Sequence, residues 1–423
     1  MTNILLAATA LDTGNTAWMI MATILVLLMS IPGIALFYGG LVRQKNVLSV
    51  IMQTMLIVGV VTLLWVAVGY SWAFGTGFKE SGSPLWAVMG GLDKCFLHGI
   101  TPDTITETGI PEAVFAMFQC MFSLITPALI LGAFAERIKF KGYMVFTILW
   151  VVIAYFPMAH WVWGGGFLQQ MGAIDFAGGT VVHINAGVSA LVMALMIGRR
   201  DDYDKGHAIL PHNVTTVFMG TSFLWLGWFG FNAGSGLCAD GIAANALLVT
   251  HVAAAAAAVT WMVIDWTCNN KPTTVGACTG AVAGLVAITP AAGSTDLLGA
   301  FAIGIITPVV CFVMVAVVKP FFKYDDALDA FGVHGMGGIV GSLLTGVFAT
   351  RCVTGEDGVQ GALYGDWHQL GVQVVATLVS IVFSAVVTYI LYVAVDKTIG
   401  LRVDKRVEEE GLDVYEHGES AYN

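Results

Sequence analysis

The sequence predicts an all-helical membrane protein, and three observations lead to this prediction. Of the 423 residues, 57% are hydrophobic and only 11% are charged, whereas a soluble domain carries about 25% charged residues. The mean hydropathy is +0.81. The apolar runs are continuous, as in membrane helices, whereas barrel strands alternate apolar and polar residues. This composition excludes a soluble enzyme and a disordered protein, and the net charge of −10 excludes a nucleic-acid-binding protein.

Runs of about 20 apolar residues mark membrane-spanning helices. Eleven such runs occur, at 17–42, 47–73, 112–135, 142–163, 178–198, 213–236, 241–266, 274–290, 296–318, 330–349 and 367–395. The eighth is short and carries Gly276, Gly280 and Gly284 at a spacing that lets helices pack closely. We therefore expect an N-terminal segment at 1–16, a membrane domain at 17–395 and a tail at 396–423.

Lysine and arginine are distributed unequally between the alternating loops. One side holds fifteen of them: Arg43, Lys45, Arg137, Lys139, Lys141, Arg199, Arg200, Lys205, Lys271, Lys319, Lys323, Lys397, Arg402, Lys405 and Arg406. The other side holds only Lys79, Lys94 and Arg351. Because cytoplasmic loops are enriched in positive charge, we expect a cytoplasmic C-terminus and, with an odd number of spans, an extracytoplasmic N-terminus.

Two features of the predicted outer side stay open. The apolar run Ile4–Leu11 has no basic residue before it and is a poor signal peptide, so either the first helix inserts unaided or a signal has been removed. The seven cysteines show no Cys-x-x-Cys spacing, which argues against zinc or redox chemistry. Cys95 and Cys352, both in predicted outer loops, are the pair that a disulfide would join.

Spans one to five and six to ten are candidates for an internal repeat, with the eleventh as an extra helix. An odd number of spans in each half inverts the halves, and inverted repeats are a transporter architecture with the substrate path between them. The fifth span opens with Asp175 and reaches His183, and the tenth opens with Asp329 and reaches His334. Each aspartate is expected to cap its helix, and Asp175 is also a candidate for attracting a cation.

His183 and His334 lie inside apolar, glycine-rich spans, where an ionisable group is costly and therefore a functional candidate. We expect the two rings to line a narrow path, share one N–H···N hydrogen bond and relay protons. The alternatives are two imidazoles bonded to carbonyl groups, a metal site for which further ligands are not visible, and acid/base groups of a membrane enzyme without a visible nucleophile. His251, beside an alanine run, is expected to be a packed core residue.

Aromatic residues gather at the predicted outer ends of three spans. Trp163 ends span four, Phe118 and Phe122 share a face of span three, and Trp228–Ser235 ends span six. An interfacial aromatic belt is the ordinary explanation for each one. Together they also suit a cation, because a tryptophan face attracts one by about 0.5–2 kcal/mol and a serine hydroxyl accepts an N–H.

Seven stretches in a fixed order make the chain resemble the Amt/Mep ammonium transporter family from about Ala17 to the C-terminus. They are Pro32–Leu41 (PGIALFYGGL), Gly132–Ile138 (GAFAERI), Trp163–Gly166 (WGGG), Asp175–Gly187 (DFAGGTVVHINAG), Trp228–Ser235 (WFGFNAGS), Phe331–Gly335 (FGVHG) and Glu410–Val414 (EGLDV). The tryptophan at 163 favours the Amt branch over the related Rh proteins.

The resemblance implies a homotrimer in the cell membrane with one ammonia or ammonium pore in each subunit and no cofactor. It also implies an outer ammonium site at Trp163, Phe118 and Ser235, a gate of Phe122 and Phe231, pore residues His183, His334 and Trp228, and structural support from Asp175. The tail resembles the segment through which subunits touch and a PII signalling protein blocks the pore. An ammonium sensor on the same scaffold is the alternative, although such sensors usually carry an added signalling domain.

Overall fold

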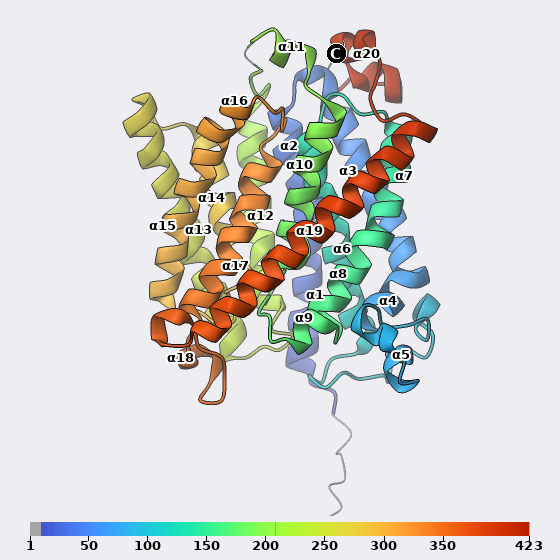
Figure 1. The fold of residues 1–423 in the computed structure, drawn as a ribbon, viewed down its shortest axis with the longest axis vertical. Coiled ribbons are helices and arrows are strands. Elements are labelled where there is room, and N and C mark those ends of the chain that lie inside the picture. The colour runs from blue at the N-terminus through green and yellow to red at the C-terminus, as the bar shows by residue number, and fades with distance from the viewer. Residues whose placement is uncertain (1–9, 208, 423) are drawn as a thin grey trace, which may run out of the picture.

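The computed structural model describes residues 10–207 and 209–422 and consists of helices joined by loops (Figure 1). Residues 1–9, with most of the apolar run that starts at Ile4, lie outside the described residues. Within the described ranges, strand pairing is limited to two isolated bridges, Ile105 with Pro111 and Ile138 with Arg402. The predicted all-helical class is therefore confirmed.

Ten helical stretches in the described chain are long and apolar enough to cross a membrane. They are Thr13–Leu41 (α1, α2), Gln44–Glu80 (α3 to α5), Glu112–Phe134 (α6), Phe140–Gln170 (α7 to α9), Gly179–Ile197 (with α10), Val214–Gly234 (α12), Gly241–Asn269 (α13), Leu297–Phe322 (α15, α16), Phe331–Phe348 (with α17) and Trp367–Thr398 (α19). The shorter α14 (Thr274–Ile288) packs against α12, α13, α15 and α17. Each predicted run falls on one of these helices.

Several of these stretches consist of consecutive elements. The components are α1 (Thr13–Leu28), α2 (Ala35–Leu41), α3 (Val47–Leu64), α4 (Tyr70–Phe74), α5 (Gly77–Glu80), α7 (Phe140–Trp150), α8 (Phe156–Trp163), α9 (Phe167–Gln170), α10 (Asn185–Ile197), α15 (Leu297–Val313), α16 (Lys319–Phe322) and α17 (Met336–Phe348). Short helices outside the bundle are α11 (Asp201–Asp204), α18 (Arg351–Thr354) and α20 (Lys405–Glu410). Most of the components are joined by short π-helical turns, at Met29–Ile34, Trp65–Gly69, Val151–Tyr155 and Met314–Val318, a feature that often occurs at functional sites.

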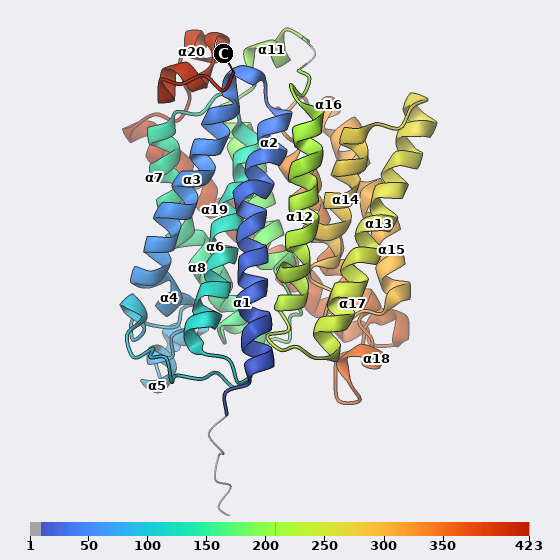
Figure 2. The ribbon, with the colours of Figure 1, turned by 180° about the vertical axis from the view of Figure 1, so that it is seen from behind.

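The connecting segments gather at two opposite ends of the bundle. α11, α16 and α20 lie at one end, together with the C-terminus, whereas α4, α5, α9 and α18 lie at the other (Figure 1). Figure 2 shows the opposite face of the bundle, on which α3, α1, α12 and α13 lie. We call the end with α20 cytoplasmic and the end with α5 outer, following the predicted charge distribution.

The long helix α19 crosses one face of the bundle diagonally (Figure 1). A line of buried polar side chains runs along its inner face: Gln369, Gln373, Thr377, Ser380, Ser384 and Thr388. Ser384 Oγ donates to Asn185 Oδ1 (2.8 Å), and Thr388 Oγ1 pairs with Ser189 Oγ (2.7 Å). Since polar groups in a membrane interior need protein partners, this line fixes α19 against α10.

His251 is exposed on α13 and does not lie in the core, so this expectation was wrong. Its ring centroid lies 5.5 Å from that of Trp225 and 6.0 Å from that of Phe229. The buried face of α13 recurs every three or four residues and includes Ala246, Thr250, Ala253 and Ala257, which excludes position 251. The neighbouring alanines gave no information about the face on which the histidine lies.

All seven cysteines are free in this structure. Cys352 is exposed and Cys95 is partly buried, and no disulfide joins them.

Candidate functional site

The two central histidines lie in wide first turns, at Gly179–Ile184 before α10 and at Phe331–Gly335 before α17. The two helices run in opposite directions and touch backbone to backbone. A Cβ atom added to Gly187 would collide with the backbone of Gly335. Only glycine permits this approach, and the contact brings the two turns together at the centre of the bundle.

Each of these helix starts is capped by a buried aspartate. Asp175 accepts hydrogen bonds from the backbone amides of residues 178 to 181, at 2.6 to 3.0 Å. At the other start the cap is Asp326, which accepts from the amides of Ala330 (3.0 Å) and Phe331 (2.8 Å). Both aspartates lie eight positions before their histidine, a spacing that would have identified the pair.

The expectation that Asp329 caps the second helix was wrong. Asp329 adopts a positive φ of 58°, and its carboxylate forms an ion pair with Lys319. The similar letters DFAGG and DAFG suggested the wrong alignment of the two helix starts, because local similarity does not reveal which carboxylate reaches the free amides.

His183 and His334 are buried side by side. Their ring centroids lie 5.5 Å apart and their planes differ by 12°. No hydrogen bond joins the rings, so the expected N–H···N bond is not formed here. Both ring nitrogens of His183 and Nδ1 of His334 lack a partner within the described residues. Such buried polar atoms are costly, and a polar solute beside the rings would satisfy them.

The Trp228 ring also lies close to His183. The two ring centroids are 5.4 Å apart and the planes differ by only 13°. The indole Nε1 of Trp228 donates to Thr289 Oγ1 (2.8 Å), and this hydroxyl donates to Leu285 O. The hydrogen bond fixes the indole, so the imidazole of His183 has a rigid aromatic neighbour in Trp228 as well as its contact with His334.

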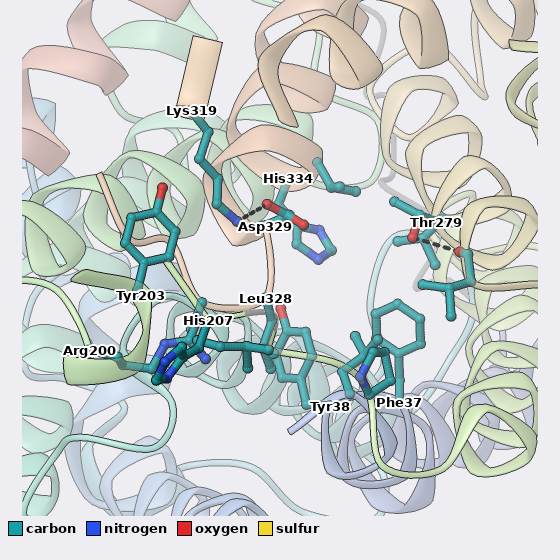
Figure 3. Close-up of a pocket in the computed structure, with 17 residues that line it drawn as sticks. Phe37, Tyr38, Arg200, Tyr203, His207, Thr279, Lys319, Leu328, Asp329 and His334 are labelled. Carbon is teal, nitrogen blue, oxygen red and sulfur yellow. Dashed lines mark hydrogen bonds and ion pairs between the residues drawn. The ribbon is translucent and has the colours of Figure 1, made fainter. Parts of the chain in front are cut away.

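A cavity of about 360 Å³ leads from the cytoplasmic end to His334. Figure 3 shows the His334 ring at this cavity, with Phe37 and Tyr38 across the open space. Asp329 and Lys319 also line it and form the ion pair drawn there. One of the two histidines is therefore accessible from this end, whereas His183 is not among the lining residues.

A second cavity, of about 180 Å³, approaches from the outer end. Its lining includes the predicted residues Trp163, Ser235 and Phe122, and also Phe74, Phe115, Gln119, Gln169, Phe176 and Leu237. The indole of Trp163 donates to Asp175 O at 2.8 Å. Ser235 Oγ donates to Phe231 O at 2.7 Å, which leaves the serine lone pairs free to accept hydrogen bonds.

Phe118 is buried next to the outer cavity. Its side chain is fully buried and meets the Phe122 ring edge to face at 5.0 Å, but it is absent from the cavity lining. Phe115 and Gln119 line the cavity from the same helix. A glutamine within an otherwise apolar span, four residues after a phenylalanine, was the available sequence signal for these two.

Phe122 and Phe231 separate the two cavities. Their rings stack at 4.2 Å with an angle of 23°, and the Phe231 centroid lies 6.1 Å from that of His183. Proceeding inward, the order is therefore the outer aromatic cavity, the phenylalanine pair, the histidine pair and the cytoplasmic cavity. A small solute that loses its charge can pass such a sequence of groups more readily than a cation.

A buried ion network lies at the cytoplasmic end and was not identified from the sequence. Arg200 bonds to Glu136 (2.9 Å) and to Asp325 (2.8 Å), and Arg43 also pairs with Glu136 (2.9 Å). Burial alone would raise the pKa of Glu136, but Arg200 and Arg43 together lower it. Burial likewise opposes the charge of Asp325, yet Arg200 and Arg137 lower its pKa to about 2. Both carboxylates therefore stay ionised at neutral pH.

The C-terminal tail packs onto this end. Asp413 accepts from the amides of Leu48 (3.0 Å) and Ser49 (2.8 Å) at the start of α3. Glu408 accepts from the amide of Asp201 (2.8 Å) and pairs with Arg402 (2.9 Å). The tail is thus connected to the first and third cytoplasmic loops of the predicted topology.

Comparisons with known proteins agree on one family. Residues 17–422 match the sequence model of the Ammonium Transporter Family. An ammonium transporter of Aquifex aeolicus is 50% identical over 98% of this chain and 94% of its own length, and one of Bacillus subtilis is 46% identical over 97% and 98%. The crystal structure of Saccharomyces cerevisiae Mep2 matches with a TM-score of 0.85 at 37% identity, over 94% of this chain and 88% of that one.

Proposed function

The chain belongs to the ammonium transporter family, and on that premise we propose how it selects and conducts its substrate. It is a multi-pass membrane transporter and not an enzyme. Ammonium is gathered at the outer cavity and gives up its proton, ammonia passes the phenylalanine pair, and the histidine pair relays the proton to the cytoplasmic cavity, so that ammonia and proton together carry current. The observation that carries this proposal is the set of buried imidazole nitrogens without protein partners beside a cavity.

Recruitment at the outer end depends on Trp163 and Ser235. The indole face of Trp163 borders the cavity and attracts a cation by about 0.5–2 kcal/mol, while Ser235 Oγ has lone pairs free for an N–H donor. Phe118 supports the site from behind, through its contact with Phe122. Potassium has a similar radius but no N–H donors, so these acceptors favour ammonium.

The gate is the stacked pair of Phe122 and Phe231. Its apolar rings make a dehydrated passage in which a bare charge is costly, about 2.5–3.5 kcal/mol even on insertion scales. Neutral ammonia meets a smaller penalty. Asp175 maintains the geometry because it fixes the turn before His183 and, through its carbonyl group, the indole of Trp163.

The histidine pair is tested by replacing both His183 and His334 with alanine. Ammonium-driven current in proteoliposomes is expected to fall at least tenfold, or to be replaced by a current that potassium also carries. His251→Ala is the matched control, since it removes an exposed histidine of a neighbouring span. Unchanged current with intact selectivity in the double variant would contradict the proposal.

The assembled transporter is proposed to be a homotrimer in the inner cell membrane. Eleven spans, an inverted five-plus-five repeat, an outer N-terminus and a cytoplasmic tail form the corresponding topology. The packing of the tail against the loop before α3 supports a regulatory role at this end, where a PII signalling protein would block the cytoplasmic cavity. Native mass spectrometry of the purified protein, alone and with a PII protein, tests both points: a monomeric mass or no complex would contradict them.

A further inference from the structure

His160 lies one helical turn before Trp163 and takes no part in the recruitment and gating proposed above. Its side chain is fully buried at the outer end of α8. The ring Nδ1 lies 2.9 Å from the carbonyl oxygen of Ala73, and Nε2 lies 2.7 Å from that of Trp86. Ala73 belongs to α4, and Trp86 belongs to the short helix Pro84–Ala87. One ring therefore joins α8 both to the end of α4 and to the short helix in the loop that follows α4, and we call this end of α4 and the loop together the outer loop.

A neutral imidazole cannot satisfy both of these carbonyl groups. It has one N–H donor and one lone pair, so its second nitrogen would place a lone pair less than 3 Å from a carbonyl oxygen. No other hydrogen-bond donor reaches either carbonyl in the described part of the chain. Two short N···O distances are both favourable only when both ring nitrogens carry a hydrogen.

We propose that His160 is an imidazolium clamp, which holds the outer loop against α8 in its doubly protonated form and thereby positions Trp163 for ammonium. Loss of one proton releases one carbonyl group and loosens the turn that carries the indole. His160 is thus a positioning residue whose effect on uptake rests on the proposed recruitment at Trp163.

The turn after Trp163 is pressed against the same loop. A Cβ atom added to Gly164 would collide with the Ala73 carbonyl oxygen, and one added to Gly165 would collide with the Trp86 ring. The amides of Gly164 and Gly166 both donate to the carbonyl oxygen of His160 (3.0 Å). A displacement of the loop therefore removes the surface on which this turn rests.

The other charged groups around this end of α8 have partners of their own. Asp93 accepts from the amides of Thr76 and Gly77, and Asp175 accepts from four amides. Glu112 pairs with Lys94 and accepts a hydrogen bond from Tyr70. Lys79 lies 5.6 Å from the Trp86 ring centroid. α9 has no titratable side chain, and His183 lies in the turn before α10. The protonation of His160 therefore decides whether both carbonyl groups accept a hydrogen bond from this ring.

The kinetic test compares three proteins at outer pH values between 5.5 and 8. In wild type, the half-saturating ammonium concentration is expected to rise at least threefold as the pH rises. The maximal flux should depend on pH to about the same extent in wild type and in the variants. His160→Gln keeps two N–H donors that do not titrate. The half-saturating ammonium concentration of this variant should therefore stay low and independent of pH. His160→Leu has no donor, so its half-saturation is high at every pH. The same pH profile in wild type and His160→Gln would overturn the clamp's control of uptake.

The protonation state is tested directly by ¹⁵N NMR of protein labelled at histidine. The His160 signals are those missing in His160→Gln, or in His160→Asn if the glutamine variant is unstable. We expect the imidazolium pattern at pH 6 and its loss at higher pH, whereas a neutral ring from pH 5 to 8 would overturn the clamp. Trp163→Leu separates the two proposals: an unchanged half-saturation would contradict recruitment at Trp163, while the His160 signals would still report the clamp.

Discussion

The two helix starts at the centre of the bundle share a design but differ in their surroundings. At the outer start, Asp175 accepts four amides and His183 is enclosed by Trp228 and the phenylalanine pair. At the cytoplasmic start, Asp326 accepts two amides and His334 faces a cavity of about 360 Å³. The comparison teaches that one backbone device can place one histidine in an enclosed setting and the other beside a cavity, and the proposed path would use these as a dry half and a wet half.

The largest difference is expected between the two capping aspartates. Asp175→Ala leaves four buried amides without an acceptor, at about 1–3 kcal/mol each, so this variant is expected to show the larger fall in melting temperature. Asp326→Ala leaves two, so the variant is expected to fold with a lower melting temperature. Thermal unfolding of both purified variants measures this, with Asp329→Ala as the control for a nearby carboxylate that caps no helix. Equal destabilisation by both caps would contradict the asymmetry.

The two histidines are expected to differ next. His183→Ala should reduce ammonium flux about tenfold, because His183 lines neither of the two cavities. His334→Ala should reduce it only about threefold, since water in the cytoplasmic cavity can replace the ring's hydrogen bonds. Proteoliposome flux at saturating ammonium checks both values, and a larger loss at His334 would reverse the assignment of dry and wet halves.

Trp163→Leu tests whether the outer half begins with a cation site. Its half-saturating ammonium concentration should rise about fivefold, equivalent to about 1 kcal/mol of lost cation attraction. Trp161→Leu is the control two positions away, because this indole donates to Val88 O and packs against Phe167 and Phe383. An equal loss of uptake at all ammonium concentrations would argue against recruitment.

The smallest effect concerns the pH dependence of stability at the cytoplasmic start. Burial raises the pKa of Asp326 to about 6, against the lowering effect of Lys319. The folded state then binds more protons than the unfolded chain between about pH 4 and 6, so acidification from pH 7 to 5 should stabilise by about 1 kcal/mol. Asp326→Asn should remove this dependence, which melting temperatures at pH 5 and 7 measure.

Asp325 contributes with the opposite sign. Its lowered pKa of about 2 gives stability that is present above about pH 4 and is lost as the pH falls toward 2. Asp325→Asn should therefore leave the profile between pH 5 and 7 unchanged while lowering the melting temperature at both values. A change of slope in this variant would show that the two carboxylates titrate as one unit.

The fold could be predicted because hydrophobic runs long enough to cross a membrane indicate membrane-spanning helices. The histidines and Trp163 could be predicted because polar or aromatic groups in such runs are conspicuous. The role of Asp326 as the helix cap could not be predicted. Either Asp326 or Asp329 could cap this helix, and the outcome depends on which carboxylate reaches the free amides in three dimensions. His251 was placed wrongly because composition does not specify a helix face. The burial of Phe118 also could not be predicted, because it depends on how Gly234 packs against the ring.

The buried polar line of α19 has a consequence for the biogenesis of the protein. Asn185 and Ser189, which bond to Ser384 and Thr388, precede them by 199 residues, so α10 is synthesised long before its partner. Until α19 has been synthesised, Asn185 and Ser189 do not have these hydrogen-bond partners. The packing of α10 on this face of the bundle can therefore be completed only after the last long helix has been synthesised.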